Sequence, residues 1–361
     1  MIELVAVGKT YPGATVPAVT SLDLAVATGE IVALVGPSGC GKTTTLKMIN
    51  RLIEPSRGTI RVAGRDVSSV AAPELRRGIG YVIQHTGLFP HRTIAENIAT
   101  VPRMLGWDRA AITRRVGDLV ELMGLDPGIG QRYPAELSGG QRQRVGVARA
   151  LAADPPVLLM DEPFGAVDPI LRSRLQDELL ALQRRLHKTI VLVTHDIDEA
   201  IKVADRVAIL NVGGVLEQYA PPAELLSAPA NPFVDGFLGP DRGIKRLSLI
   251  SISDVPLEAG PVVAPGADAA EVADAMRRYG VDWFGVVSGG DLQGWAWGSE
   301  ASSGVAGVAL RPFAVRLQGS ATLRDALDTA ITGHTRVAPV FDGERYLGML
   351  TVDAISRQVV G

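Results

Sequence analysis

Nine residues beginning at Gly36, GPSGCGKTT, have the composition and spacing of a phosphate-binding loop. Glycines let backbone N–H groups wrap around phosphate oxygens, Lys42 can neutralise the β and γ oxygens, and the Thr43 hydroxyl can reach Mg²⁺. The run IVALV before the loop indicates a strand and KTTTLKMINRL after it indicates a helix, which is the context such a loop requires. The expected nucleotide contacts are Gly36, Pro37, Ser38, Gly39, Cys40, Gly41, Lys42, Thr43 and Thr44.

Two adjacent acids follow the apolar run VLLM further along the chain. Asp161 can hold a metal ion through water, and Glu162 can accept a proton from an attacking water. The alternative is a solvated pair of acids at the end of a strand. A phosphate loop in the same chain favours the catalytic interpretation.

Two further polar residues follow strand-like runs. His195 ends IVLVTH, and an imidazole there can hydrogen-bond a γ-phosphate and hold the attacking water in register with Glu162. Gln84 follows GIGYVI and can reach Mg²⁺ and the water. We therefore expect Glu162, His195 and Gln84 to form the catalytic group and Thr43, Gln84 and Asp161 to hold the metal. Tyr11 can stack on an adenine ring or pack within its own loop.

A second turn that suits an anion lies at LSGGQ, directly before a run that indicates a helix. Small residues let the backbone N–H groups at Ser138, Gly139, Gly140 and Gln141 crowd together, and the helix N-terminus carries partial positive charge. The loop at Gly36 already supplies what one triphosphate needs. These residues alone therefore do not indicate which phosphate Ser138 contacts.

The elements that must position these residues indicate an α/β domain with a mostly parallel sheet. EIVALVG, PPVLLMD and KTIVLVTHD read as buried parallel strands, whose carboxyl ends deliver side chains to one edge. IELVAV, SLDLAV and GTIRVAG alternate as an antiparallel flank does, and RVAILNVGGVLEQY indicates a hairpin at Gly213 and Gly214.

The organisation of the chain changes near residue 240. Prolines at 221, 222, 229, 232 and 240 predict a connector without a long helix. Beyond it, the stretch from Ala267 repeats from Ala321, each copy in the order helix, strand, turn, strand, and the two copies are expected to pair into one domain. The predicted domains are 1–240, a linker at 241–255, and 256–361.

Composition excludes several classes of protein. A net charge of −3 and a pI near 6.0 over 361 residues offer no basic surface for nucleic acid. The start of the chain lacks signal-peptide features and the apolar runs are only as long as strands, so a cytoplasmic chain that reaches a membrane through a partner is expected. Cys40 is the single cysteine and excludes a disulfide within one chain.

The order of these motifs resembles the nucleotide-binding subunit of an ABC transporter over residues 1 to about 240. The resemblance implies a P-loop NTPase cassette with a mostly parallel sheet, an antiparallel flank and a helical subdomain, which binds ATP and Mg²⁺ and stacks Tyr11 on adenine. It also implies a head-to-tail homodimer, in which each cassette caps the ATP of the other. The residues it assigns to that contact in trans are Ser138, Gly139, Gly140, Gln141 and Asp168.

Longer stretches, such as QHTGLFPHRTIAENI and THDIDEAIKVADRVAIL, resemble the ATPase subunits of osmoprotectant importers for glycine betaine, carnitine or choline. This implies permease subunits in the membrane, an indirect link to a solute-binding protein, and a peripheral position on the cytoplasmic face. The alternatives are an importer subunit for another small solute and a soluble nucleotide-sensing ABC protein.

The C-terminal repeat is similar to a pair of CBS motifs, an α+β regulatory domain. Thr351 and Asp353 stand where CBS domains contact a nucleotide ribose. The resemblance to importer subunits that carry CBS domains implies ionic strength or an adenine nucleotide as the regulator, and the alternative is a dimer-stabilising domain without a ligand. The first copy has Trp295 and Trp297 in this region and neither polar residue. The alternative to a role in ligand binding is that these tryptophans pack in a core or at a dimer interface.

Overall fold

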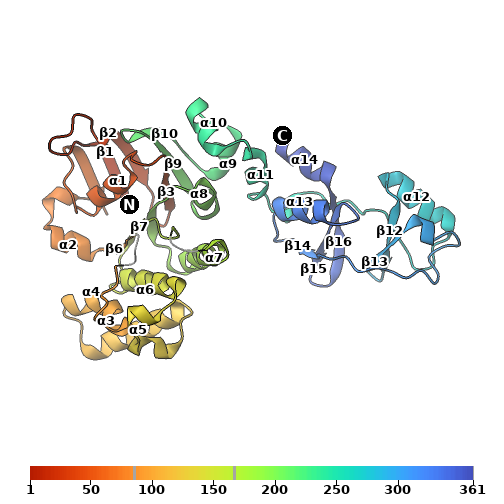
Figure 1. The fold of residues 1–361 in the computed structure, drawn as a ribbon, viewed down its shortest axis with the longest axis horizontal. Helices are drawn as coiled ribbons and strands as arrows, with labels where there is room; N and C mark the ends of the chain where they lie inside the picture. The colour runs from red at the N-terminus through yellow and green to blue at the C-terminus, as the bar shows by residue number, and fades with distance from the viewer. Residues whose placement is uncertain (84–86, 166–167, 361) are drawn as a thin grey trace. The chain divides into compact units, whose positions relative to one another are not determined.

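The computed structural model describes residues 1–83, 87–165 and 168–360 (Figure 1). The chain divides into two compact units, Met1–Gly239 and Pro240–Gly361. Gln84, one of the predicted catalytic and metal-binding residues, lies outside the described residues.

The first unit is built on a six-stranded sheet with the order β10-β9-β3-β8-β7-β6. Neighbours from β9 to β6 are parallel, and β10 pairs antiparallel with β9 through the predicted hairpin. The predicted buried strands are therefore confirmed. The bounds are β3 (Ile31–Val35), β6 (Ile79–Val82), β7 (Val157–Asp161), β8 (Thr189–Val193), β9 (Arg206–Asn211) and β10 (Val215–Ala220).

The predicted antiparallel flank is a second sheet with the order β2-β1-β4-β5. Its strands are β1 (Ile2–Lys9), β2 (Val19–Val26), β4 (Arg57–Val62) and β5 (Arg65–Asp66). Between the two sheets lies one hydrophobic core, which also includes Leu46 and Met48 of α1 (Lys42–Ile49).

The parallel sheet is buried on both faces because its apolar strands alternate between two cores. In β3, Val32 and Leu34 face the core shared with the antiparallel sheet, whereas Ile31, Ala33 and Val35 face the other core. That second core is closed by α6 (Gly139–Leu151), α7 (Pro169–Leu186) and α8 (Ile197–Val203).

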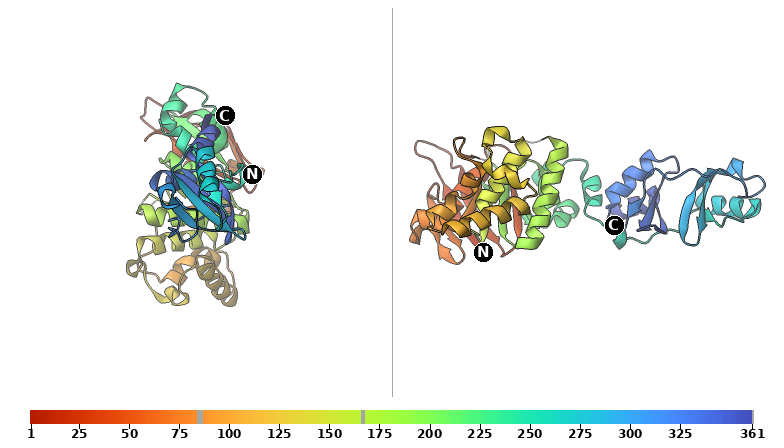
Figure 2. Two further views of the ribbon diagram at one scale, coloured as in Figure 1. Left: turned by 90° about the vertical axis from the view of Figure 1, so that its right-hand side faces the viewer. Right: turned by 90° about the horizontal axis from the view of Figure 1, so that it is seen from below.

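A helical region is inserted between β6 and β7. It comprises α3 (Ile94–Ile98), α4 (Thr100–Met104), α5 (Arg109–Leu122) and α6, with 3₁₀ turns at Pro127–Gln131 and Pro134–Glu136. Figure 1 and the left view of Figure 2 show these helices gathered at one end of the unit, away from the antiparallel sheet. The helical subdomain that the resemblance implied is therefore present.

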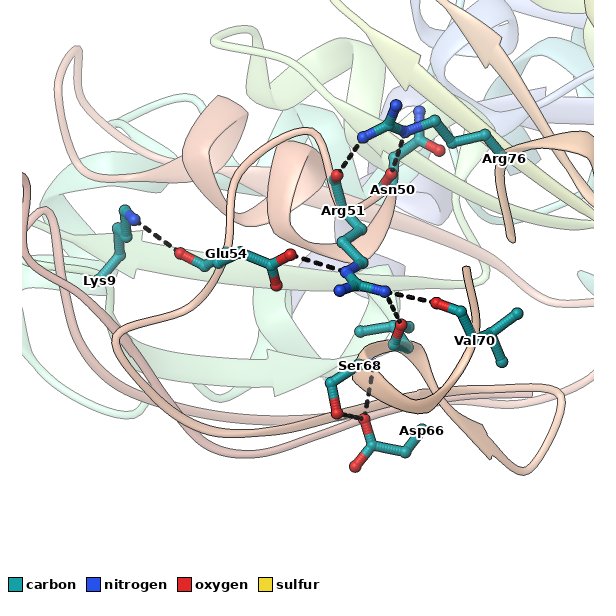
Figure 3. Close-up of polar contacts among 9 residues, drawn as sticks. Lys9, Asn50, Arg51, Glu54, Asp66, Ser68, Val70 and Arg76 are labelled. Carbon is teal, nitrogen blue, oxygen red and sulfur yellow. Dashed lines mark hydrogen bonds and ion pairs between the residues drawn. The ribbon is translucent and has the colours of Figure 1, made fainter. Parts of the chain in front are cut away.

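Arg51, just after α1, ties this helix to the antiparallel flank (Figure 3). Its Nη1 donates to the carbonyl oxygens of Val67 at 3.0 Å and Val70 at 2.5 Å, and its Nε donates to Glu54 Oε1 at 2.7 Å. Arg76, in α2 (Ala72–Arg77), donates in turn to the Arg51 carbonyl. One guanidinium thus satisfies two backbone carbonyls next to the 3₁₀ turn Val67–Ser69.

Replacing Arg51 with alanine is expected to destabilise the first unit by about 2 kcal/mol, because hydrogen bonds from a charged donor are lost and two carbonyls lose their partner. The measurement is the midpoint of urea unfolding of the full chain. Arg61→Ala is the matched control. The Arg61 side chain is 51% exposed and its ion pair with Glu3 is long, at 3.7 Å, so this substitution should cost less than about 0.5 kcal/mol. Equal midpoints for the two variants would contradict the role of Arg51.

The proline-rich segment differs from the predicted connector. Pro222 begins α9 (Pro222–Ser227) and Pro232 begins α10 (Pro232–Leu238), where a missing N–H costs nothing. Leu225, Val234 and Leu238 are fully buried in the second core of the first unit. The prolines therefore start two short packed helices.

The second unit confirms the predicted repeat. β11 (Val262–Val263), α12 (Ala269–Tyr279), β12 (Trp283–Ser288) and β13 (Asp291–Trp297) form the first copy. β14 (Leu317–Gln318), α13 (Leu323–Thr332), β15 (Val337–Asp342) and β16 (Arg345–Thr351) form the second, followed by α14 (Val352–Val360). Each copy has a three-stranded sheet.

The two copies meet through their last strands, β13 and β16. Trp283, Trp295 and Met349 are buried in one cluster there, and Trp297 packs against it. Packing is thus what the structure shows for these tryptophans.

The predicted linker, 241–255, is part of the second unit. It forms α11 (Arg242–Leu247) and a 3₁₀ turn at Ile252–Asp254, and Leu247, Ile252 and Val255 are buried with α13 and α14 residues. These apolar side chains give the segment a packing face that a linker would lack.

Candidate functional site

The loop at Gly36 connects β3 to α1 at the carboxyl edge of the parallel sheet. Gly36 has φ 150° and Gly41, the N-cap of α1, has φ 103°. A Cβ would lie 2.1 Å from the Leu210 carbonyl oxygen at Gly36 and 2.6 Å from the Ala18 carbonyl oxygen at Gly41. Both positions require glycine, which keeps the backbone close to the sheet and its N–H groups at the helix N-terminus.

Lys42 is folded against this loop. Its side chain is buried, and Nζ donates to the carbonyl oxygens of Gly36 at 2.7 Å and Pro37 at 3.0 Å. Cys40 is fully buried beside it and belongs to the core between the sheets. The loop therefore positions one ammonium group among its own backbone atoms, where a phosphate is expected.

Thr43 and Asp161 meet across the sheet edge. Thr43 Oγ1 donates to Asp161 Oδ1 at 3.0 Å, and Asp161 is only 7% exposed. Burial raises the pKa of Asp161, while the Thr43 hydrogen bond and the nearby Lys47 act in the opposite direction. A hydroxyl and a carboxylate are the hard oxygen donors that Mg²⁺ prefers, so these residues fit the predicted metal site.

Glu162 and His195 line one pocket together with the phosphate loop. His195 Nδ1 is 3.3 Å from Glu162 Oε1, and the imidazole is 62% exposed. Glu162 has φ 47°, a left-handed conformation that is strained for a non-glycine residue, and its N–H donates to the Val193 carbonyl oxygen. The pocket is lined by Ser38, Gly39, Gly41, Lys42, Thr43, Thr44, Glu162 and His195.

Tyr11 lies at the rim of this loop. Its hydroxyl is 3.3 Å from Thr44 Oγ1, and 39% of the residue is exposed. The ammonium of Lys9 lies 5.4 Å from the centre of the ring. The structure thus places an exposed aromatic ring next to the predicted phosphate site.

Comparisons with known proteins identify the family of the chain. The family model described as ABC transporter matches residues 19–165, and the CBS domain model matches residues 308–361. The chain is 46% identical over 365 residues to the osmoprotectant import ATP-binding protein OsmV of Salmonella typhimurium, covering 99% of this chain and 95% of that protein. The chain belongs to the ABC transporter family.

Two further comparisons extend this result. The glycine betaine/carnitine/choline transport ATP-binding protein OpuCA of Bacillus subtilis is 45% identical, with 100% of this chain and 96% of that protein covered. A dimeric ATP-binding cassette, solved in a post-hydrolysis state with ADP and Pi bound, matches with a TM-score of 0.56 and 32% identity. That match covers 62% of this chain and 99% of the solved one.

In this ABC cassette, the residues expected to act in trans lie at two helix N-termini. Ser138 is the N-cap of α6: its Oγ accepts from the Gln141 N–H at 3.3 Å, and Gln141 Oε1 accepts from the Ser138 N–H at 3.0 Å. Asp168 caps α7 by accepting from the Leu171 N–H at 3.0 Å. Neither residue lines the pocket of its own chain.

Gly139 and Gly140 differ in their surroundings. Gly139 is exposed and a Cβ there would meet nothing within 4 Å, whereas a Cβ at Gly140 would lie 2.7 Å from Leu171 Cδ2. Gly140 therefore also serves the packing of α6 on α7, which the sequence motif did not reveal.

Glu199 is a neighbour of the site that sequence reasoning missed. It is 5% exposed in α8, and Thr194 Oγ1 donates to its Oε2 at 3.0 Å. Burial raises its pKa to about 7. Thr194 also accepts from the Asp196 N–H at 3.0 Å, so Glu199 supports the turn that carries His195. The available signal was an acid on an otherwise apolar helix face.

The predicted regulatory residues lie where β16 meets α14. Thr351 Oγ1 accepts from the Ala354 N–H at 3.2 Å, and Asp353 is exposed. The strand registers place Trp297 of the first copy at the position of Thr351 in the second. Within the described residues, no helix combines the length and apolar character needed to cross a membrane.

Proposed function

We propose that this cassette hydrolyses ATP to power the import of a compatible solute, of the glycine betaine, carnitine or choline class, through an ABC transporter in the membrane. The observation that carries the proposal is the match to osmoprotectant import proteins along nearly the whole chain, including the second unit. It also rests on a pocket in which a phosphate loop faces Glu162 and His195.

In the proposed reaction, Glu162 accepts the proton of the attacking water, and His195 holds Glu162 and the γ-phosphate in register. The distance of 3.3 Å between His195 Nδ1 and Glu162 Oε1 supports this pairing. Lys42 and the loop N–H groups stabilise the charge on the phosphates. Thr43 and Asp161 hold Mg²⁺, which when bound neutralises the phosphate oxygens. Gln84, which lies outside the described residues, is proposed to contact the same metal ion and the attacking water.

The active species is a proposed head-to-tail homodimer. The turn from Ser138 to Gln141 and Asp168 in one cassette would cap the ATP held by the other. Two features support this arrangement: Ser138 and Gly139 are exposed, and neither they nor Asp168 line the pocket of their own chain. Donors that a partner supplies only on closure would make ATP bind the closed dimer more tightly than the open one.

A cross-link tests this dimer. Ser38→Cys on one chain and Gly139→Cys on another, both with Cys40→Ala, are expected to join through a short bismaleimide only when ATP is present with Glu162→Gln. Both positions are exposed, and Gly139 has space for a side chain. Arg109→Cys paired with Ser38→Cys is the control, because Arg109 is exposed on α5 and is not among the residues of the proposed contact. Equal yields for both pairs, or no ATP dependence, would contradict the head-to-tail dimer.

Permease subunits and, through them, a solute-binding protein are the proposed partners, and they would hold the chain at the cytoplasmic face of the membrane. The test is to purify the complex with its permease and measure ATP turnover with the solute-binding protein. Glycine betaine, carnitine or choline should stimulate turnover, and sulfate should not. Stimulation by sulfate alone would favour an importer of another solute.

The second unit is proposed to regulate the cassette, with an adenine nucleotide at Thr351 and Asp353 as ligand. In support of this site, the Thr351 hydroxyl lies at the start of α14 and Asp353 is exposed, and a hydroxyl and a carboxylate can both hydrogen-bond ribose hydroxyls. The first copy offers Trp297 in place of Thr351, which supports one ligand site per chain.

A chain that ends at Gly239 should keep its ATPase activity and lose regulation, because the cut falls between the two compact units. ATP turnover and solute uptake of the complex are measured while salt and adenine nucleotides are varied. The control is the full-length chain with Asp353→Asn, which should lose the response to adenine nucleotide and keep the response to salt. Identical responses of the truncated and full-length complexes would contradict regulation by this unit.

A further inference from the structure

The position of His195 depends on the backbone turn that carries it, between β8 and α8. Its imidazole is 62% exposed, so the packing of the ring alone does not hold it in place. Within the turn, the Thr194 N–H donates to the Leu34 carbonyl oxygen at 3.2 Å, and the Thr194 hydroxyl accepts from the Asp196 N–H at 3.0 Å. The residues that hold this turn therefore set the place of His195 beside Glu162.

Asp196 holds the turn with both of its carboxylate oxygens. Oδ1 caps α8 by accepting from the N–H groups of Asp198 at 2.9 Å and Glu199 at 3.3 Å. Oδ2 accepts from Arg172 Nη1 of α7 at 3.3 Å. Since α7 and α8 also pack against each other, this ion pair ties the residue next to His195 to the neighbouring helix.

Arg172 lies at the end of the first turn of α7. Its N–H donates to the Asp168 carbonyl oxygen at 2.8 Å, and the Asp168 side chain caps the same turn. Asp168 is also a residue of the proposed contact with a second cassette. A continuous series of hydrogen bonds thus runs from Asp168 through Arg172 and Asp196 to the turn of His195.

The ion pair of Arg172 with Asp196 is suited to positioning more than to stability. The two side chains are 31% and 30% exposed, and ion pairs with this access to water add little to the free energy of unfolding. A second ion pair joins the same two helices: Lys202, in the last turn of α8, lies 2.8 Å from Asp177 Oδ1 of α7. The helices therefore keep one link when Arg172 is replaced.

We propose that Arg172 is a positioning residue for ATP hydrolysis, which through Asp196 ties the turn of His195 to the first turn of α7. The inference rests on the proposed function, in which His195 holds Glu162 and the γ-phosphate in register. A partner cassette that contacts Asp168 then acts on the same helical turn to which the histidine is tied. Binding of ATP to the phosphate loop does not depend on Arg172.

Steady-state ATP turnover of the full chain provides the first measurement. Arg172→Met removes the ion pair, and it should lower kcat about 10-fold while KM for ATP stays within about 2-fold, because the phosphate loop is intact. Arg172→Lys should recover at least about half of the unmodified rate, since a single nitrogen makes the contact. Lys202→Met is the matched control: it breaks the other ion pair between α7 and α8 and should hydrolyse ATP at the unmodified rate.

Two further readouts show whether Arg172→Met leaves the fold and the dimer intact. The melting temperature should stay within about 2 °C of that of the unmodified chain. In the Glu162→Gln background, the ATP-dependent cross-link between cassettes should form with the same yield, because Asp168 is unchanged. A large fall in either readout would overturn a role limited to positioning.

The His195→Ala background separates positioning from general damage to the site. The histidine to be positioned is absent there, so Arg172→Met should slow single-turnover hydrolysis by less than about a further 2-fold. The inference is overturned by an equal loss in that background, by equal rates of Arg172→Met and Lys202→Met, or by no recovery in Arg172→Lys. Full-rate hydrolysis by Arg172→Met while Glu162→Gln is slowed overturns this inference alone, whereas full-rate hydrolysis by Glu162→Gln overturns the proposed chemistry as well.

Discussion

Glu162→Gln is expected to lower the rate of ATP hydrolysis by about 10² to 10⁴ while ATP binding persists. The amide keeps the size of the side chain and its place 3.3 Å from His195, but it cannot accept a proton from water. ATP should therefore remain bound and hold the two cassettes together. The measurements are single-turnover hydrolysis, ATP affinity and the ATP-dependent mass of the protein in solution.

Glu224→Gln is the matched control, because Glu224 is an exposed acid in the first turn of α9. It should hydrolyse ATP at the rate of the unmodified chain. A Glu162→Gln variant that turns over at a comparable rate would remove Glu162 from the role of general base. Loss of ATP binding in that variant would instead indicate that the φ of 47° at this position depends on the carboxylate.

Gly36→Ala is expected to weaken ATP binding by at least about 100-fold, and it should leave the second unit folded. The added Cβ would lie 2.1 Å from the Leu210 carbonyl oxygen, a backbone atom in the neighbouring strand that cannot move aside alone. The loop must therefore shift away from β9 and carry its N–H groups with it. A loss of affinity of about 100-fold corresponds to about 2.8 kcal/mol, which is the size expected when about two hydrogen bonds to a charged phosphate are lost.

Gly64→Ala separates this clash from the strain of a positive φ. Gly64 has φ 76° but no atom within 4 Å of an added Cβ, so this variant should lose only about 1 kcal/mol of stability and keep its affinity for ATP. Fluorescent ATP titration and thermal melting of both variants provide the readouts. Unchanged affinity in Gly36→Ala would contradict the close approach of the loop to β9.

Much of the first unit was predictable because its signals are local. The buried strands are continuous apolar runs, and the alternation of β3 between two cores follows from the period of two in a strand. These prolines predicted a connector because a segment with prolines in the first turns of short helices has the same amino-acid composition as a proline-rich loop. Only burial of Leu225 and Val234 distinguishes the two.

The candidate site was likewise predictable only in part from the sequence. The phosphate loop and the acids after β7 could be identified from the sequence, because their residue types and spacing are set by the chemistry of a triphosphate and its metal. The proposed contacts in trans were implied only by the resemblance, since no pattern within one chain indicates which surface meets a second copy. Glu199 was not predicted because a single acidic residue on a helix does not form a recognisable sequence motif.

The sequence alone was enough to predict which residues would bind and hydrolyse a triphosphate, and in which order strands, helices and repeats follow along the chain. What those residues touch depends on the tertiary structure: the 3.0 Å contact of Thr43 with Asp161 and the pairing of His195 with Glu162. The physical reason is distance along the chain. Local patterns encode turns and faces, whereas Thr43 and Asp161 meet only after three parallel strands, β3, β8 and β7, have been placed side by side.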